Sequence, residues 1–284
     1  MEEKRISQFK ELGIYTSQYI RILLSDKKNL AVSLLFPVIA AIIVVWIAGE
    51  NMFVHYEGTK SGCFVIVSAA IWGGLFNSIQ TIVKERSNIK RDYVTGIRLR
   101  CYTASRAIVQ FVLCMIQSAI LTTSYIGVEK FRDNAMPKTG IEFHNPLIEY
   151  YITILLLMYA ADAMGLFISC FVKKEETANV LAPYILIVQL IFSGILFEMK
   201  GASEKVSYAM LSRWGMEGLG SICDLNSLPL KIHATFPDVP HTVENMYKYG
   251  GKHLLFVWIV LLLFALGFIL VGNLVLHSVS KDSR

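Results

Sequence analysis

Charged side chains of both signs crowd one short stretch of the chain, between residues 84 and 102. Glu85, Arg86, Arg91 and Asp92 lie within about two helical turns of one another. Acids and bases at this spacing form ion pairs, and pairs that are partly desolvated near lipid headgroups are stronger than fully exposed ones. The stretch therefore predicts an ion-pair network that holds a short surface helix rigidly.

The same stretch carries apolar side chains at four-residue intervals. Ile89, Tyr93 and Ile97 follow one face of a helix, and the charges lie mostly elsewhere. This pattern predicts an amphipathic helix with a ridge that would dock into a groove on a partner. The alternative is a basic loop that only fixes the orientation of the chain in a membrane. The residues alone do not choose between the two.

Polar side chains also interrupt the long apolar segments of the sequence. Gln110, Gln117 and Ser124 recur every seven residues on one stripe, with Arg106 at its foot. Such residues either hydrogen-bond between membrane helices or line a path for a substrate. Asp162 is the one acid well inside an apolar segment, and we expect it to be paired, protonated or hydrated.

Several signatures of enzymes are missing from the sequence. The phosphate-binding loop Gly-x-x-x-x-Gly-Lys-Ser/Thr does not occur, and neither does the zinc-protease motif His-Glu-x-x-His. The six histidines are not grouped at the spacing of metal ligands. We therefore expect no metal site, no cofactor and no ATPase activity in this chain.

The elements that position these residues are membrane helices. The chain has 284 residues, of which 54% are hydrophobic and 17% charged, whereas a soluble domain carries about 25% charged residues. Its apolar blocks approach the roughly 20 residues that a helix needs to cross a bilayer. The fold class is therefore all-α and polytopic, which excludes a soluble enzyme and leaves no nucleic-acid partner. Six spans are predicted, at residues 30–49, 61–83, 104–127, 147–172, 179–197 and 254–276.

The distribution of basic residues sets the orientation. Of the 27 Lys and Arg residues, 17 fall on one side of the predicted spans, so we expect both termini to be cytoplasmic. Residues 1–29 form a predicted amphipathic helix in the membrane interface, although a helix that packs on a partner protein is the alternative. An outer loop spans 198–253. Cys63 and Cys223 fall near the outer side, where we expect unpaired thiols or a bridge at Cys223 between two chains.

Several strings in this order resemble type-2 ABC transporter permeases, especially those of the G subfamily. In the segment 84–103, Glu85-Arg86, Arg91-Asp92, Gly96 and Tyr102 resemble the coupling-helix region of that family, with Asp in place of the usual Glu. Further likeness comes from Gly165-Leu166, Phe192-Ser193-Gly194, Ser212-Arg213-Trp214 and Glu217-Gly218-Leu219. The resemblance covers essentially the whole chain.

The resemblance implies half of an exporter in a bacterial plasma membrane. Two permease chains, as a homodimer or a heterodimer, would enclose a path, and a separate ATP-binding subunit would carry ATP and Mg. Coupling to that subunit would involve Glu85, Arg86, Arg91, Asp92, Tyr93, Gly96 and Ile97. The path between the second and fifth spans would be lined by Trp72, Phe76, Asn77, Gln80, Gln189, Phe192 and Ile195. Such a lining suits an amphipathic substrate: a lipid, a peptide or a hydrophobic small molecule. A secondary transporter and a membrane enzyme are the alternatives.

Overall fold

The computed structural model describes residues 7–48, 53, 55–94, 96, 98–131, 140–143, 145–197, 199–228 and 244–279. Within these ranges the chain is helical and has no strand, which confirms the predicted all-α class. The helices, in chain order, are α1 (Gln8–Ser25), α2 (Lys27–Ala48), α3 (Tyr56–Ser78), α4 (Arg86–Val94), α5 (Leu99–Phe131), α6 (Pro146–Phe171), α7 (Glu175–Ile191), α8 (Ala202–Ser207), α9 (Leu211–Ile222) and α11 (Gly251–Val279).

Five of these helices are long and apolar enough to cross a membrane: α2, α3, α5, α6 and α11. The predicted fifth span, residues 179–197, corresponds to α7, which has only 17 residues. Several predicted bounds differ by five residues or more, including the start of the second span, which lies at Tyr56 instead of residue 61. The second span ends at Ser78 instead of residue 83, because residues 79–85 leave the helix as turns, and the third helix begins at Leu99 instead of residue 104.

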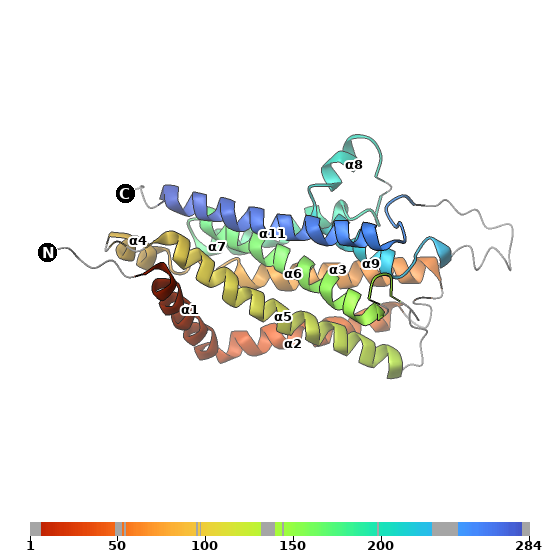
Figure 1. The fold of residues 1–284 in the computed structure, drawn as a ribbon, viewed down its shortest axis with the longest axis horizontal. Helices are drawn as coiled ribbons and strands as arrows, with labels where there is room; N and C mark the ends of the chain where they lie inside the picture. The colour runs from red at the N-terminus through yellow and green to blue at the C-terminus, as the bar shows by residue number, and fades with distance from the viewer. Residues whose placement is uncertain are drawn as a thin grey trace.

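The long helices lie side by side (Figure 1): α3, α5 and α11 pack on α6, and α2 packs on α3 and α5. In α6, 78% of the apolar stretch is buried, against 28% in α2 and α11, which face outward. Small residues bring α3 and α6 together. A Cβ added at Gly165 would lie 2.6 Å from the backbone oxygen of Leu75, and one added at Gly74 would lie 3.0 Å from the backbone nitrogen of Asp162. Gly74 and Gly165 therefore permit close packing of α3 on α6.

Helix α1 turns away from α2 at one end of the molecule (Figure 1). Asp26 lies at this bend, where its carboxylate accepts hydrogen bonds from the backbone N–H and the side-chain amide of Asn29 and so caps α2. Helix α4 lies at the same end of the bundle, because Tyr93 packs edge-on to His277 near the end of α11. The start of α2, helix α4 and the end of α11 therefore share one end, which we call the α4 end.

The predicted outer loop 198–253 holds a packed helix. Every residue of α9 is buried, against α3, α6 and α11. Gly215 and Gly218 permit this approach, since a Cβ at Gly215 would lie 2.7 Å from Leu157, and one at Gly218 would lie 2.9 Å from Thr153. This end of the bundle is thus closed by a helix that lies among the spans.

Candidate functional site

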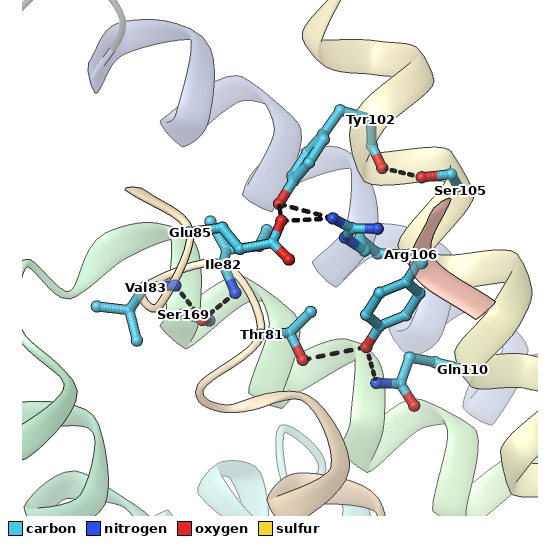
Figure 2. Close-up of polar contacts among 10 residues, drawn as sticks. Thr81, Ile82, Val83, Glu85, Tyr102, Ser105, Arg106, Gln110 and Ser169 are labelled. Atoms are coloured by element: carbon cyan, nitrogen blue, oxygen red, sulfur yellow. Dashed lines mark hydrogen bonds and ion pairs between the residues drawn. The ribbon is translucent and has the colours of Figure 1, made fainter. Parts of the chain in front are cut away.

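A buried group of charged and aromatic residues joins the turns after α3 to α5 (Figure 2). The side chain of Arg106 is fully buried, and its Nη2 lies 2.5 Å from Oε2 of Glu85. Tyr102 donates a 2.5 Å hydrogen bond to the same carboxylate oxygen. The ring of Tyr19, from α1, lies against the guanidinium, with 4.0 Å between its centroid and Cζ. We call Glu85, Arg106, Tyr102 and Tyr19 the charge cluster.

The composition of the charge cluster follows from the burial of Arg106. A guanidinium taken out of water needs an opposite charge and aromatic faces to offset its lost hydration. Burial also raises the pKa of Tyr19 to about 12, so its hydroxyl stays protonated. The Tyr19 hydroxyl accepts a 2.7 Å hydrogen bond from Nε2 of Gln110. Tyr19 therefore fastens helix α1 to α5.

Ser169 of α6 sets the path of the turns that carry Glu85. Its hydroxyl accepts hydrogen bonds from the backbone N–H groups of Ile82 and Val83, at 2.9 and 3.0 Å (Figure 2). These N–H groups have left the α3 helix and need a new acceptor. With the turns held on α6 in this way, the Glu85 side chain points toward α5.

Two arginines fasten the segment to further helices. Arg86 donates to the carbonyl oxygens of Val172, at 2.6 Å, and Cys170, at 3.3 Å, where the end of α6 leaves carbonyls unpaired. Arg98 lies 3.6 Å from the Glu11 carboxylate of α1, and its backbone N–H donates to the same carboxylate. Among the described residues, ion pairs join Glu85 to Arg106 of α5 and Arg98 to Glu11 of α1, whereas Arg86 hydrogen-bonds to carbonyl oxygens at the end of α6.

The predicted docking ridge on α4 faces the protein itself. Ile89 is buried with Leu99 and Leu276, and Tyr93 packs against this cluster. Ile97 lies outside the described residues, as does the side chain of Asp92. Gly96 follows α4 with a φ of 91°, a conformation that favours glycine. Among the α4 side chains that the structure describes, the exposed ones are the polar Ser87, Asn88 and Arg91. A partner would therefore meet the polar face of α4, opposite the apolar ridge.

Four of the predicted path residues line a groove of about 470 Å³ between α1, α2, α3 and α5. Trp72 and Phe76 stack at its wall, with ring centroids 5.3 Å apart, and each remains about two-fifths exposed. Asn77 on α3 and Gln80 in the turns after α3 also line the groove. Other residues that line the groove include Asp26, Phe36, Lys84, Glu85 and Gln117.

The floor of the groove is polar. Gln117 donates a hydrogen bond to the backbone oxygen of Ser33 at 3.0 Å and accepts one of 2.6 Å from the Asn77 amide. Gln110, about two helical turns before Gln117, donates to the backbone oxygen of Asn77 at 3.1 Å. Within the stripe predicted on the third span, Gln110 joins helices, and Gln117 both joins helices and lines the groove. This composition, apolar walls with a few convergent polar groups, is typical of a small-molecule site.

The remaining predicted path residues lie elsewhere. Gln189 is buried, and its Oε1 accepts a 3.1 Å hydrogen bond from the backbone N–H of Ser212, so it fastens α7 to α9. Phe192 and Ile195 are half-buried in the turn after α7 and do not line the groove. Gln80 donates to the side chain of Asn179 on α7. This amide pair joins the turn after α3 to α7.

The sequence analysis missed Tyr19, Ser33 and Ser169 as functional positions. Tyr19 carried a signal, since it lies on the apolar face of the predicted N-terminal helix. Asp162 is buried, and its two carboxylate oxygens have no hydrogen-bond partner among the described residues. Across the same residues, His, Cys, Asp and Glu side chains form no group of three that would hold a metal ion.

Comparison with known families decides the class of protein. The model of the ABC-2 type transporter family matches residues 11–222, three quarters of the chain. The chain belongs to the ABC-2 transporter family. Its matched part begins in α1 and runs through the charge cluster and the groove to α9. As an ABC-2 membrane domain, the protein is a permease and not itself an ATPase.

One relative has a wider architecture. The chain is 22% identical over 232 residues to the ABC transporter ATP-binding/permease protein Rv1747 of Mycobacterium tuberculosis, strain ATCC 25618 / H37Rv. The match covers 78% of this chain and 26% of Rv1747. The chain therefore spans about a quarter of the relative, whose name joins an ATP-binding function to a permease.

Proposed function

We propose that this ABC-2 permease is the membrane subunit of an ATP-driven exporter that moves an amphipathic molecule out of the cytoplasm. The groove carries this proposal. It offers Trp72 and Phe76 to an apolar tail, an amide floor to polar groups, and the charges of Asp26, Lys84 and Glu85 to a headgroup. A lipid, a peptide or a hydrophobic small molecule has this combination of surfaces.

Glu85 connects the groove to the coupling segment. The same side chain lines the groove and pairs with Arg106 in the charge cluster. One residue further along, Arg86 holds the end of α6 and begins α4. A displacement of α4 by an ATP-binding subunit would therefore reach the groove through two adjacent residues, without a long chain of contacts.

The proposed partner is an ATP-binding subunit on a separate polypeptide, which would hold ATP and Mg and dock on the polar face of α4. A cysteine placed at Asn88 tests this contact, because a short bifunctional crosslinker should join it to a polypeptide that carries a phosphate-binding loop. A cysteine at Lys205, exposed on α8, is the matched control. Crosslinking from position 205 and not from 88 would contradict the docking site.

A second permease chain is proposed to meet α7. Within the chain α7 packs sparsely, and it leaves Val180, Tyr184, Ile187 and Val188 exposed on one side. A partner there, in a homodimer or a heterodimer, would bring Gln189 and Phe192 toward a groove on the neighbouring chain. Tyr184→Cys should crosslink between differently tagged copies if the dimer is homomeric, whereas Leu270→Cys on α11 should not.

We further propose that α7 is a sixth crossing and that both termini are cytoplasmic, in a bacterial plasma membrane. The α4 end holds both the start of α2 and the end of α11, which requires an even number of crossings. Helix α7 begins four residues after α6 ends at Phe171, and its far end contacts the start of α9. An impermeant thiol reagent applied to intact cells should label Lys205→Cys and leave Asn88→Cys unlabelled, and the reverse pattern would overturn the orientation.

The substrate class is tested at the wall of the groove. Replacing Trp72 and Phe76 by Ala removes stacked apolar surface, so we expect the affinity for an added amphiphile to fall by roughly 10-fold or more. The readouts are amphiphile binding in nanodiscs and the amphiphile-stimulated part of ATP hydrolysis by the complex. Leu263 and Leu266, exposed on α11, provide a matched double Ala control. Equal losses in both variants would contradict the groove as the site.

A further inference from the structure

Two cysteines that are 160 residues apart in sequence meet at the end of the bundle opposite α4. The Sγ atoms of Cys63 and Cys223 lie 3.5 Å apart, and both side chains are buried. The hydroxyl of Tyr150 lies 2.5 Å from Sγ of Cys223 and covers the pair from α6. The two thiols touch each other directly, with no side chain between them.

The fold holds these two positions firmly in place. Cys63 lies about two turns into α3, and Cys223 is the residue that ends α9, where its backbone N–H bonds to the carbonyl of Leu219. Helix α9 is pressed onto α3, since a Cβ at Gly215 would lie 3.1 Å from Val67. Closing the sulfurs from 3.5 Å to a bond needs a movement of about 1.5 Å. Rotation about two side-chain bonds supplies a movement of that size.

We propose that Cys63 and Cys223 form a disulfide within the chain, on the outer side of the membrane. The two thiols each give up one proton and one electron, an S–S bond forms between their Sγ atoms, and an external disulfide is reduced to two thiols. The oxidant is thus a protein or small-molecule disulfide in thiol–disulfide exchange, the chemistry of an oxidising compartment. The proposal rests on the proposed orientation, which puts this end of the bundle outside.

The other cysteines lack such a partner among the described residues. Cys101 contacts the backbone oxygen of Gln8, Cys114 contacts the Asn77 amide, and neither lies against another sulfur. Cys170 lies near the end of α6, beside the Arg86 contact. These three cysteines therefore serve as internal controls for the pair.

A disulfide at this place has a mechanical consequence. It would tie the end of the buried helix α9 to α3, the helix whose other half forms the wall of the groove. Helix α9 and the wall that α3 gives to the groove would then move as one rigid body. We expect reduction to loosen α9 while the α4 end stays unchanged.

The test maps thiols in the full chain. Membranes are dissolved in SDS with iodoacetamide, the protein is then reduced, and thiols freed by reduction take an isotopically heavy iodoacetamide. We expect the heavy label on Cys63 and Cys223 and the light label on Cys101, Cys114 and Cys170. A peptide that joins positions 63 and 223 should appear before reduction, in a chain that migrates as a monomer.

Light label on both Cys63 and Cys223 would overturn the proposal, and so would a bridge from either residue to another chain. A second arm separates the two possible reasons for light label. If glutathione disulfide closes the pair in the purified protein while the pair is reduced in cells, the error lies in the orientation. If glutathione disulfide does not oxidise the two cysteines, the error lies in the geometry of the pair. The permease assignment stands in both cases.

Stability gives an independent readout. Reduction should lower the thermal midpoint of the unsubstituted protein by roughly 5–10 °C. Cys63→Ala should abolish that dependence on reductant, and Cys114→Ala should keep it. If reductant does not change the thermal midpoint of the unsubstituted chain, the result contradicts a disulfide between Cys63 and Cys223.

Discussion

At the scale of single residues, the charge cluster has unequal members. The Arg106 side chain is 0% exposed, whereas Glu85 is 22% exposed and lines the groove. Removing the charge of Arg106 or that of Glu85 therefore leaves the other charge in very different surroundings. A lone Glu85 keeps its hydrogen bond from Tyr102 and some contact with water, but a lone Arg106 is a buried cation without a counter charge.

We expect Glu85→Gln to destabilise the protein more than Arg106→Met. A buried charge that loses its partner costs roughly 3–5 kcal/mol, and the loss of a hydrogen bond to a charged group costs roughly 1.5–3 kcal/mol. Thermal unfolding of the purified variants in one detergent measures the order. An Arg106→Met midpoint below that of Glu85→Gln would show that the cluster does not depend on compensating the guanidinium.

A second residue-scale prediction concerns Glu217 on α9. Burial raises its pKa to about 7, against an ordinary value of 4.5, with Arg213 and Lys248 acting in the opposite direction. His253 lies 3.2 Å from the carboxylate. The folded state thus holds a proton that the unfolded chain releases above pH 4.5. Stability from this group is complete below about pH 4.5 and is lost as the pH rises through about 7.

The difference in thermal midpoint between Glu217→Gln and the unsubstituted chain should therefore rise from pH 5 to pH 8. The change corresponds to roughly 3 kcal/mol at most, since one pKa unit is about 1.4 kcal/mol. Repeating the comparison in a His253→Gln background removes the titration of the imidazole. A difference that stays constant with pH would contradict the raised pKa.

At the scale of elements, the packing of α3 on α6 rests on glycine. A Cβ at Gly74 would overlap the backbone oxygen of Met158 and lie 3.0 Å from the Cβ of Ala161. A backbone oxygen inside a helix cannot move aside alone, so the two helices would have to separate.

Gly74→Ala should therefore cost roughly 3 kcal/mol, as overpacking of a well-packed core does. Gly267 on α11 is the matched control, because nothing lies within 4 Å of an added Cβ there. Gly267→Ala should leave stability unchanged or raise it by roughly 0.5–1 kcal/mol. The thermal midpoints of both variants are measured in one unfolding series. Equal midpoints would mean that the interface between α3 and α6 accommodates an added methyl group.

The helical elements were predictable because twenty-residue apolar blocks have few alternatives in a membrane. The amphipathic character of α4 was also visible, from Ile89 and Tyr93. What its ridge contacts was not visible, because four-residue spacing defines a face without saying whether that face meets a partner or the same chain. The pairing of Glu85 with Arg106 was hidden for a related reason: Ser169, far away in sequence, sets the path of the turns.

At the scale of the whole molecule, the groove and the coupling segment share the α4 end. Trp72 to Gln80 could be named as path residues only through the resemblance, since apolar and amide side chains on a helix also serve packing. That these residues form a groove together with α1 and α2 could not be predicted, because the bend at Asp26 determines where α1 lies. The contact of Cys63 with Cys223 depends in the same way on α9 returning among the spans.

The most direct test of this account is ATP-dependent movement of a fluorescent amphiphile across the membrane of proteoliposomes. These contain the permease and the ATP-binding partner that crosslinking identifies. We expect movement away from the nucleotide-exposed face that needs both polypeptides and ATP, and that falls when Trp72 and Phe76 are replaced by Ala. Movement by the permease alone, driven by an ion gradient and indifferent to ATP, would contradict the account and indicate a secondary transporter.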